Sequence, residues 1–240
     1  DLANNRQDPA GPNPRHTGTT FRYGHVGLKY QPSVYVSVQN ESGSGLYGGI
    51  KLKLADWPIH IEAARENFGL TSGSARALNA GLTANKLGIE AKWGGAAGTL
   101  SGRLGLYKIS DGNQLRTTML LFSPNWRPLG AAFKPYASVD TRDVTFNTPN
   151  YWSPLAGSGT LGLGVIAEWA EKDWFFFASG QLGTRLYGEA GDSSWSASLG
   201  GQRWLNRDTA VTVNLWAMSS VRDLAKYKAQ ALTVKLDRLW

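Results

Sequence analysis

The side chains that most often do chemistry are sparse in this chain. It has three histidines and no cysteine, which excludes disulfides and thiolate zinc sites. His16 lies in a polar segment, and neither His25 nor His60 has a serine two or three residues away to act as a nucleophile. His60 and Glu62 share one face of a strand-like segment, which suits a salt pair as well as an acid–base pair. We therefore expect no catalytic residues and a protein that is not an enzyme.

Carboxylates are also scattered along the chain. No run has the dense Asp, Asn and Gly spacing of a calcium loop. Residues 188–194 (GEAGDSS) offer at most a surface contact for calcium, and a plain turn accounts for them better. We expect neither a metal site nor a cofactor.

The charge balance is basic but dispersed. Lys and Arg number 25 against 18 Asp and Glu, giving a formal charge of +7. The basic residues stand singly and alternate with apolar ones, and no nucleic-acid-binding motif accompanies them. We therefore expect no nucleic-acid partner.

Alternation is the dominant pattern of the chain. Val34, Val36 and Val38 alternate with polar neighbours, and the C-terminal ALTVKLDRLW does the same, as expected of strands with one apolar and one polar face. Such units recur between turn clusters from about residue 19 onward and predict about fourteen strands, within a range of twelve to sixteen. The weaker segments 21–30 and 76–85 are included as strands. Short polar turns alternate with longer connections rich in Gly, Ser and Asn.

These strands fit a membrane barrel better than a soluble β-sandwich or β-propeller. Their polar faces carry Gly, Ser, Thr, single charges and Tyr, and their apolar faces often end in an aromatic residue. No stretch of about 18 apolar residues predicts a membrane-spanning helix. The predicted fold is all-β, a transmembrane antiparallel up-and-down β-barrel formed by residues 19–240 and preceded by a polar arm or linker at residues 1–18. Outer-membrane lipid would surround it.

Barrel closure would explain how the chain can end on an amphipathic strand. If the last strand pairs with the first, no edge remains exposed. The terminal Trp240 then lies at the membrane interface, where outer-membrane barrels often carry an aromatic assembly signal. The sequence starts at Asp1 without a signal segment, so we expect either a removed signal peptide or a longer protein.

The polar faces predict the lining of the bore. Their basic residues give it a positive potential that attracts anionic groups, although many charges should pair across the wall. Inward aromatic rings would suit sugars, which have apolar faces and hydroxylated edges, or would simply fill space. The predicted lining and polymer-contact residues are Arg103, Tyr107, Arg116, Lys134, Tyr136, Arg142, Arg185, Tyr187 and Lys235.

One loop has two interpretations. Tyr151, Trp152, Ser153 and Pro154 lie in a connection long enough to fold into a bore and gate or plug it. Alternatively, prolines stiffen it as a surface loop.

Two stretches resemble a known group. Residues 102–124 combine a strand, an Asp-Gly-Asn turn and a second strand, and residues 141–157 carry the Tyr-Trp-Ser-Pro sequence. Together they resemble the C-terminal barrels of exopolysaccharide export proteins, namely the outer-membrane subunits for cellulose, poly-N-acetylglucosamine and Pel polysaccharide and a related phage receptor. The resemblance covers about residues 85–240. Trp152 replaces the usual Phe, and family barrels typically have more strands than this chain provides.

The resemblance implies a bacterial outer-membrane pore that conducts a secreted polysaccharide from periplasm to exterior. It also implies a periplasmic helical-repeat scaffold upstream and an inner-membrane synthase complex as partners. A receptor or anchor barrel and a lipid-modifying barrel enzyme remain alternatives.

Overall fold

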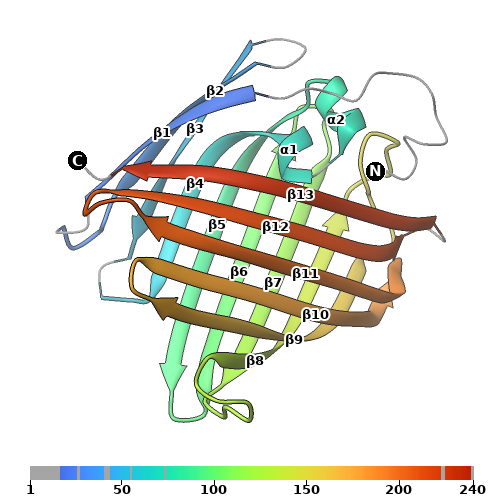
Figure 1. The fold of residues 1–240 in the computed structure, drawn as a ribbon. Coiled ribbons are helices and arrows are strands. Elements are labelled where there is room, and N and C mark those ends of the chain that lie inside the picture. The colour runs from blue at the N-terminus through green and yellow to red at the C-terminus, as the bar shows by residue number, and fades with distance from the viewer. Residues whose placement is uncertain are drawn as a thin grey trace.

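The computed structural model describes residues 17–25, 28–40, 44–54, 56–72, 74–222 and 225–238. Thirteen strands there form one sheet, in which each strand pairs antiparallel with the next along the chain. The sheet curls so that its last strands pass in front of its middle strands (Figure 1). The strands are β1 (Thr17–Gly24), β2 (Ser33–Asn40), β3 (Ser44–Lys53), β4 (Ile59–Asn67), β5 (Thr83–Gly95), β6 (Gly98–Ile109), β7 (Gln114–Pro124), β8 (Phe133–Val144), β9 (Ser158–Glu171), β10 (Trp174–Gly188), β11 (Ala190–Trp204), β12 (Thr209–Arg222) and β13 (Ala225–Arg238).

This is the predicted all-β, up-and-down antiparallel architecture, with a strand number inside the predicted range. The prediction that the last strand pairs with the first is wrong for the described residues, where β1 pairs only with β2 and β13 only with β12. In an up-and-down sheet of thirteen strands the first and last strands run in the same direction, so only a parallel ladder could join them, and the described residues form none.

Residues 76–85, predicted as a strand, instead contain a helix. The connection between β4 and β5 holds α1 (Phe68–Ser72) and α2 (Ala75–Asn79). The Ser74 side chain caps α2 by accepting a hydrogen bond from the Ala77 amide at 3.3 Å. The apolar residues of this segment pack into a small core instead of alternating between two faces. Neither helix in the described part of the chain is long and apolar enough to cross a membrane.

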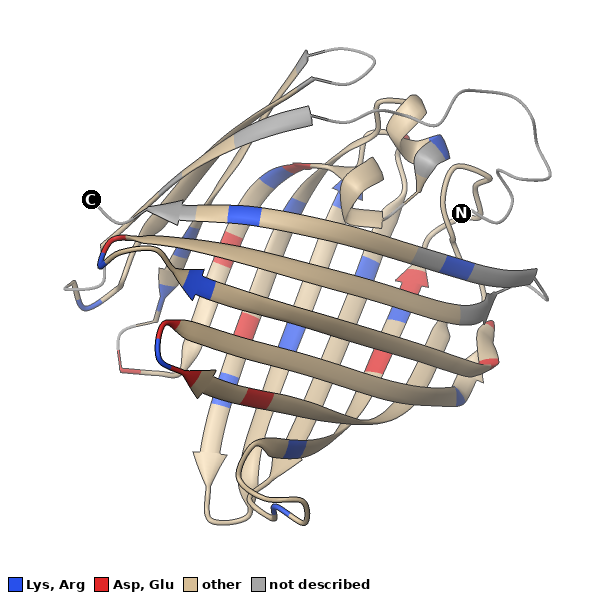
Figure 2. Ribbon diagram, in the orientation of Figure 1, with Lys and Arg blue, Asp and Glu red and all other residues tan. Residues whose placement is uncertain are grey.

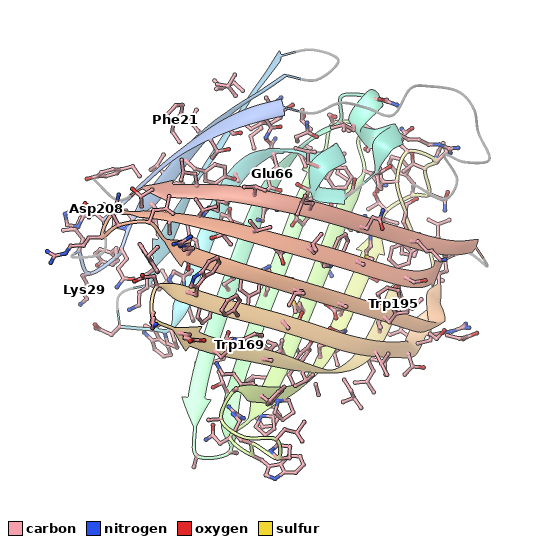
Figure 3. The ribbon with its side chains drawn as sticks, in the orientation of Figure 1. Phe21, Lys29, Glu66, Trp169, Trp195 and Asp208 are labelled. Carbon is pink, nitrogen blue, oxygen red and sulfur yellow. The ribbon has the colours of Figure 1, made fainter. Side chains whose placement is uncertain are left out.

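Cross-strand register fixes the two faces of the sheet, because paired residues point to the same side. Ile61 pairs with both Leu52 and Ile89, and the same apolar face continues through neighbouring strands. On β12, Leu215 pairs with Leu199 and with Leu232. Figure 3 places Phe21, from this apolar face, outside the curl and Glu66, from the opposite face, within it.

Strand β7 has the opposite phase to the one predicted. The sequence suggested that its larger apolar residues face lipid, but Met119 pairs with both Arg103 and Asp140 and therefore faces inward. Arg116 pairs with Leu106 and Asp143 and therefore faces outward. Apolar residues occur on both faces of β7, so alternation alone did not determine its phase.

Aromatic side chains gather on the outer face where β9 and β10 meet. The ring of Phe176 stacks on Trp169 at 5.4 Å and on Trp174 at 5.5 Å between centroids. Arg203 lies over the Trp174 ring at 5.2 Å. Aromatic and basic side chains of this kind suit the interface between lipid tails and water.

The predicted boundary between arm and barrel, at residues 18 and 19, falls close to the first described residue, Thr17. Thr17 and Gly18, assigned to the arm, open β1. Residues 1–16 and the predicted assembly signal Trp240 lie outside the described residues.

Candidate functional site

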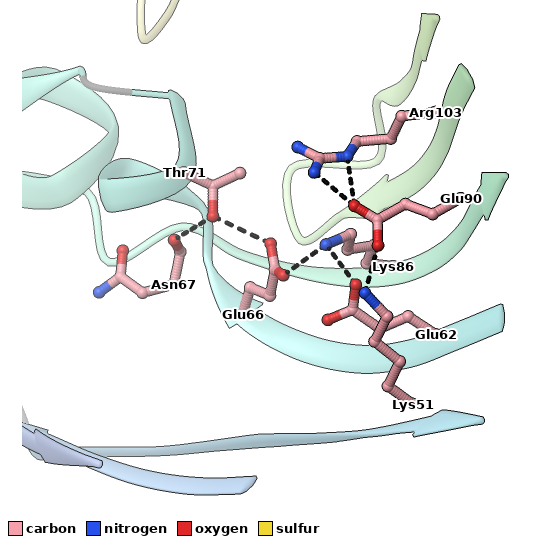
Figure 4. Close-up of polar contacts among 8 residues, drawn as sticks. All are labelled: Lys51, Glu62, Glu66, Asn67, Thr71, Lys86, Glu90 and Arg103. Atoms are coloured by element: carbon pink, nitrogen blue, oxygen red, sulfur yellow. Dashed lines mark hydrogen bonds and ion pairs between the residues drawn. The ribbon is translucent and has the colours of Figure 1, made fainter. Parts of the chain in front are cut away.

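The inner wall of the curled sheet is the candidate site, and its first part is a charged cluster on β3, β5 and β6. Glu90 accepts from Arg103 Nε at 2.8 Å and forms an ion pair with Lys51 (Figure 4). Glu90 and Arg103 are cross-strand partners, so the backbone register brings the two charges together. One carboxylate thus holds two cations from strands on either side.

A second cluster continues this wall towards α1. Lys86 Nζ lies 2.9 Å from Glu62 and 3.2 Å from Glu66, and Thr71 donates to Glu66 at 3.0 Å. One cation therefore bridges two carboxylates, the reverse of the arrangement at Glu90 (Figure 4). Paired charges of this kind brace a wet wall while leaving little net field.

The charged clusters on β3 to β6 border a cavity at one end of the sheet. We call this end, which has the connections 54–58, 96–97 and 172–173, the hairpin end. The cavity has a volume of about 610 Å³. Basic side chains outnumber carboxylates in its lining, and the positive bore remains a prediction. Its ionisable residues are Lys53, Asp56, His60, Glu90, Lys92 and Arg103.

The middle of the inner face from β8 to β12 is built differently, from uncharged polar groups, and the ion pairs Lys134–Glu168 and Arg185–Asp192 lie towards its two ends. Gln181 accepts from the Tyr136 hydroxyl at 3.0 Å and donates to Ser138 Oγ at 3.2 Å. Ser179 and Ser198 hydroxyls lie 2.8 Å apart. Figure 2 shows few charged residues along the middle of β10 to β13 and many more on β4 to β8.

Two glycines of β9 make room for this network. A Cβ atom on Gly162 would lie 2.2 Å from the Gln181 amide nitrogen, and one on Gly164 would lie 2.4 Å from the Tyr136 ring. The Gly-x-Gly spacing therefore places two backbone gaps on the inner face, because alternate residues of a strand share a face. Side chains from β8 and β10 cross β9 through these gaps.

The loop end, opposite the hairpin end, carries the two longest connections, 68–82 and 145–157. Phe68 and Tyr151, one from each, pack edge to face with centroids 4.8 Å apart. They bury inward residues at the ends of β5, β6 and β7, so both connections fold against the inner wall. We call the two connections, 68–82 and 145–157, the plug. Its residues Phe68, Ala77, Leu82 and Tyr151 form a buried core with Ala84, Ile109 and Leu115 of the wall.

Polar contacts fix the plug in place. The Tyr151 hydroxyl donates to Asp111 at 3.1 Å, and burial, reinforced by this carboxylate, raises the pKa of Tyr151 so that the phenol keeps its proton. Asn113 donates to the Phe146 carbonyl at 2.8 Å. Ser74 donates to the Asn150 carbonyl and so joins the two connections.

The predicted loop of residues 151–154 is thus anchored at several points. Tyr151, Ser153 and Pro154 are buried, and Ser153 accepts from the Thr148 amide at 2.8 Å. Trp152 is half-buried beside Arg142, whose guanidinium carbon lies 5.6 Å from the ring centroid. Whether this loop gates the bore remains a prediction.

Register places most of the predicted lining residues on the inner face. Lys134 pairs there with Glu168, and Arg185 with Asp192. Tyr107 is largely covered by the plug instead of lining open space. The inward-facing predicted residues are Arg103, Tyr107, Lys134, Tyr136, Arg142, Arg185 and Lys235.

Two predicted lining residues lie on the outer face instead. Arg116 does so because of the phase of β7. Tyr187 pairs with Gly159, which faces outward with Thr141, because a bulge between Arg185 and Tyr187 inserts an extra residue and reverses the alternation. Sequence periodicity assumes an unbroken strand and therefore misassigned the side chain that follows the bulge.

The predicted site residues do not include several groups that the structure brings into the site. Phe68 and Asn113 hold the plug, and their partners lie far away in the chain. The Gly162-x-Gly164 spacing on the neighbouring strand could have indicated that a side chain crosses there. Only the register shows that this side chain is Gln181. No three His, Asp or Glu side chains in the described ranges gather to hold a metal ion.

Comparison with known proteins shows the fold. No protein-family model matches the chain, and no curated protein matches it. Among solved structures it is similar to a bacterial polysaccharide outer membrane secretin, with a TM-score of 0.72 and 14% identity over 93% of this chain and 81% of that one. A second is OccK11 (OpdR) of Pseudomonas aeruginosa, with a TM-score of 0.46 and 11% identity over 95% and 73%. The chain has the fold of a bacterial outer-membrane β-barrel.

Proposed function

We propose that this protein is an outer-membrane pore through which a bacterium secretes a polysaccharide. The observation that carries the proposal is the register of the sheet. From β1 to β13 it keeps a mostly apolar face outward and, except on β7, a mostly polar face inward, as a lipid-embedded wall around a wet bore requires. The aromatic group at Trp169 and Trp174 supports placement at a membrane interface.

The inner wall supports a polymer as the cargo. It offers many weak, separate contacts, including hydroxyls, an amide and aromatic rings, in place of one tight binding site. Weak multiple contacts let a chain slide, because no single unit is held strongly enough to stall it. The fold is shared with a protein described as a polysaccharide secretin, which agrees with this cargo.

The proposed mechanism is passive conduction without a cofactor. The polymer enters from the periplasm, where a helical-repeat scaffold guides it, and a synthase complex in the inner membrane pushes it from behind. The residues of the bore then need only to keep it wet and to match the hydroxylated surface of the chain.

The pore is tested by reconstitution. Purified protein in planar bilayers should give discrete conductance steps, and liposomes containing it should swell in solutions of neutral oligosaccharides. Heat-denatured protein in the same detergent is the control. Folded, inserted protein that conducts no ions would overturn the proposal.

The cargo is tested in the cell. Deleting the gene should abolish extracellular polysaccharide while the polymer accumulates in the periplasm, and the wild-type gene should restore export. Normal secretion by the deletion strain would contradict a role in export and leave a receptor or anchor as the better description.

A further inference from the structure

The plug leaves the loop end asymmetric. It covers the inner ends of β5, β6 and β7, where Ala84, Ile109 and Leu115 are almost fully buried. The inner face of β8 to β11 at the same end is not part of this core. A chain that passes the loop end must therefore run along the inner face of β8 to β11.

A cavity of about 320 Å³ occupies that region. Trp152, in the plug, forms one side of this cavity, and the anchored loop holds that side in place. The strands supply the other sides through inward residues that register brings together: Asp140 pairs with Thr160, and Gln181 with Ser196. Its principal lining residues are Asp140, Arg142, Trp152, Thr160, Gln181 and Ser196.

The chemistry of this lining matches a sugar. An indole suits the apolar face of a pyranose, and Asp140 accepts hydrogen bonds from hydroxyls. Gln181 both donates and accepts, and its contacts with Tyr136 and Ser138 hold the amide in one orientation. Such fixed groups favour binding, because less side-chain freedom is lost when a ligand arrives.

The charges of the cavity argue for an uncharged sugar. Arg142 is matched by Asp140 in the same lining, so the site has no net excess of cations to hold a polyanion. The cavity at the hairpin end, by contrast, has Lys53, Lys92 and Arg103 against Asp56 and Glu90, an excess of one cation. The two ends therefore present different chemistry to a passing chain.

We propose that the cavity beneath Trp152 is a saccharide subsite that holds one or two units of an uncharged glycan as it passes the loop end. This inference rests on the proposed pore function and adds the class of cargo to it. Trp152 provides the stacking surface, and Asp140, Gln181 and Thr160 bind the hydroxylated edge.

The test is single-channel recording with two probes, cellohexaose as the neutral glycan and hexagalacturonate as the anionic one. Wild-type channels should show cellohexaose blockades that last about tenfold longer than those of the Trp152→Ala variant, because loss of a stacking surface mainly speeds dissociation. Trp126→Ala is the matched control, since Trp126 is 69% exposed in the connection 125–132 at the hairpin end. Its blockades should equal those of the wild type.

A second variant tests the polar side of the subsite without substituting a lining residue. In Gly162→Ala the new Cβ meets the Gln181 amide, which must move. Cellohexaose blockades should shorten by about threefold, while the conductance of the open channel stays unchanged. Equal blockades in the wild type, Trp152→Ala and Gly162→Ala would overturn the subsite, as would longer blockades by hexagalacturonate than by cellohexaose.

Calorimetric titration of cellohexaose into the detergent-solubilised protein separates this inference from the pore function. Binding that weakens about tenfold in Trp152→Ala supports the subsite even if no current flows. Channels that conduct normally while cellohexaose binding is the same in both proteins leave the pore standing and refute the subsite.

Discussion

The two halves of the inner wall are braced by different kinds of side-chain contact. From β3 to β6 the wall is braced by ion pairs, in which Glu90 joins Lys51 and Arg103 and Lys86 joins Glu62 and Glu66. From β8 to β12 the middle of the wall is braced by neutral hydrogen bonds centred on Gln181, and ion pairs occur only towards its two ends. We call these regions the charged wall and the neutral wall.

The difference follows from what each wall contacts. The charged wall lies next to the plug, where Thr71 of α1 binds Glu66, so part of it serves to hold structure. The neutral wall borders the cavity beneath Trp152, whose lining also includes Asp140 and Arg142. Under the proposed pore function, neutral groups give a passing polymer weaker and more easily exchanged contacts than ion pairs do.

Removing the plug from the charged wall should have the largest effect. Phe68→Ala deletes a fully buried ring and should weaken plug docking by about 3–5 kcal/mol. We expect a larger and noisier single-channel conductance. Leu155→Ala, 59% exposed in the connection 145–157, is the control and should conduct as the wild type does. An unchanged conductance in Phe68→Ala would mean that the plug does not restrict the bore.

A new charge should destabilise the protein less on the inner face of the neutral wall than on its lipid-facing outer face. Leu215→Arg places a cation on the outer face in the middle of β12 and should reduce the free energy of unfolding in vesicles by about 2–4 kcal/mol. Asn214→Arg, on the adjacent inward position, should cost less than about 1 kcal/mol. Urea titration followed by gel mobility measures both variants. An equal loss of unfolding free energy in both variants would show that the inner face of β12 is not exposed to water, which would contradict the assignment of the neutral wall to the bore.

The charged wall should control ion selectivity, with a small effect on stability. Arg103→Glu should shift the reversal potential in a KCl gradient towards cations and cost only about 0.5 kcal/mol, because this arginine is mostly exposed to solvent. The shift should shrink near 1 M salt, where screening acts within about 3 Å. Arg116→Glu, outward on β7, should leave the potential unchanged. A shift of equal size in Arg116→Glu would contradict the register of β7.

Alternation was enough to predict the architecture. Apolar residues at every second position, as in Val34–Val38, leave an antiparallel strand only one way to separate lipid from water. The same rule correctly assigned the inward faces of β5, β6 and β8, including Arg103, Lys134 and Arg142.

Only the tertiary structure determined where that rule is broken and what lies inside. The phase of β7 is ambiguous because apolar residues occupy both of its faces, and the bulge before Tyr187 has no signature in the alternation. Ala77 of α2 belongs to the same buried cluster as Tyr151, some 70 positions away, so contacts with a distant segment stabilise the helix. Periodicity is a local property of the chain. The plug, the two walls and the cavity beneath Trp152 arise from contacts between distant segments, which no local pattern records.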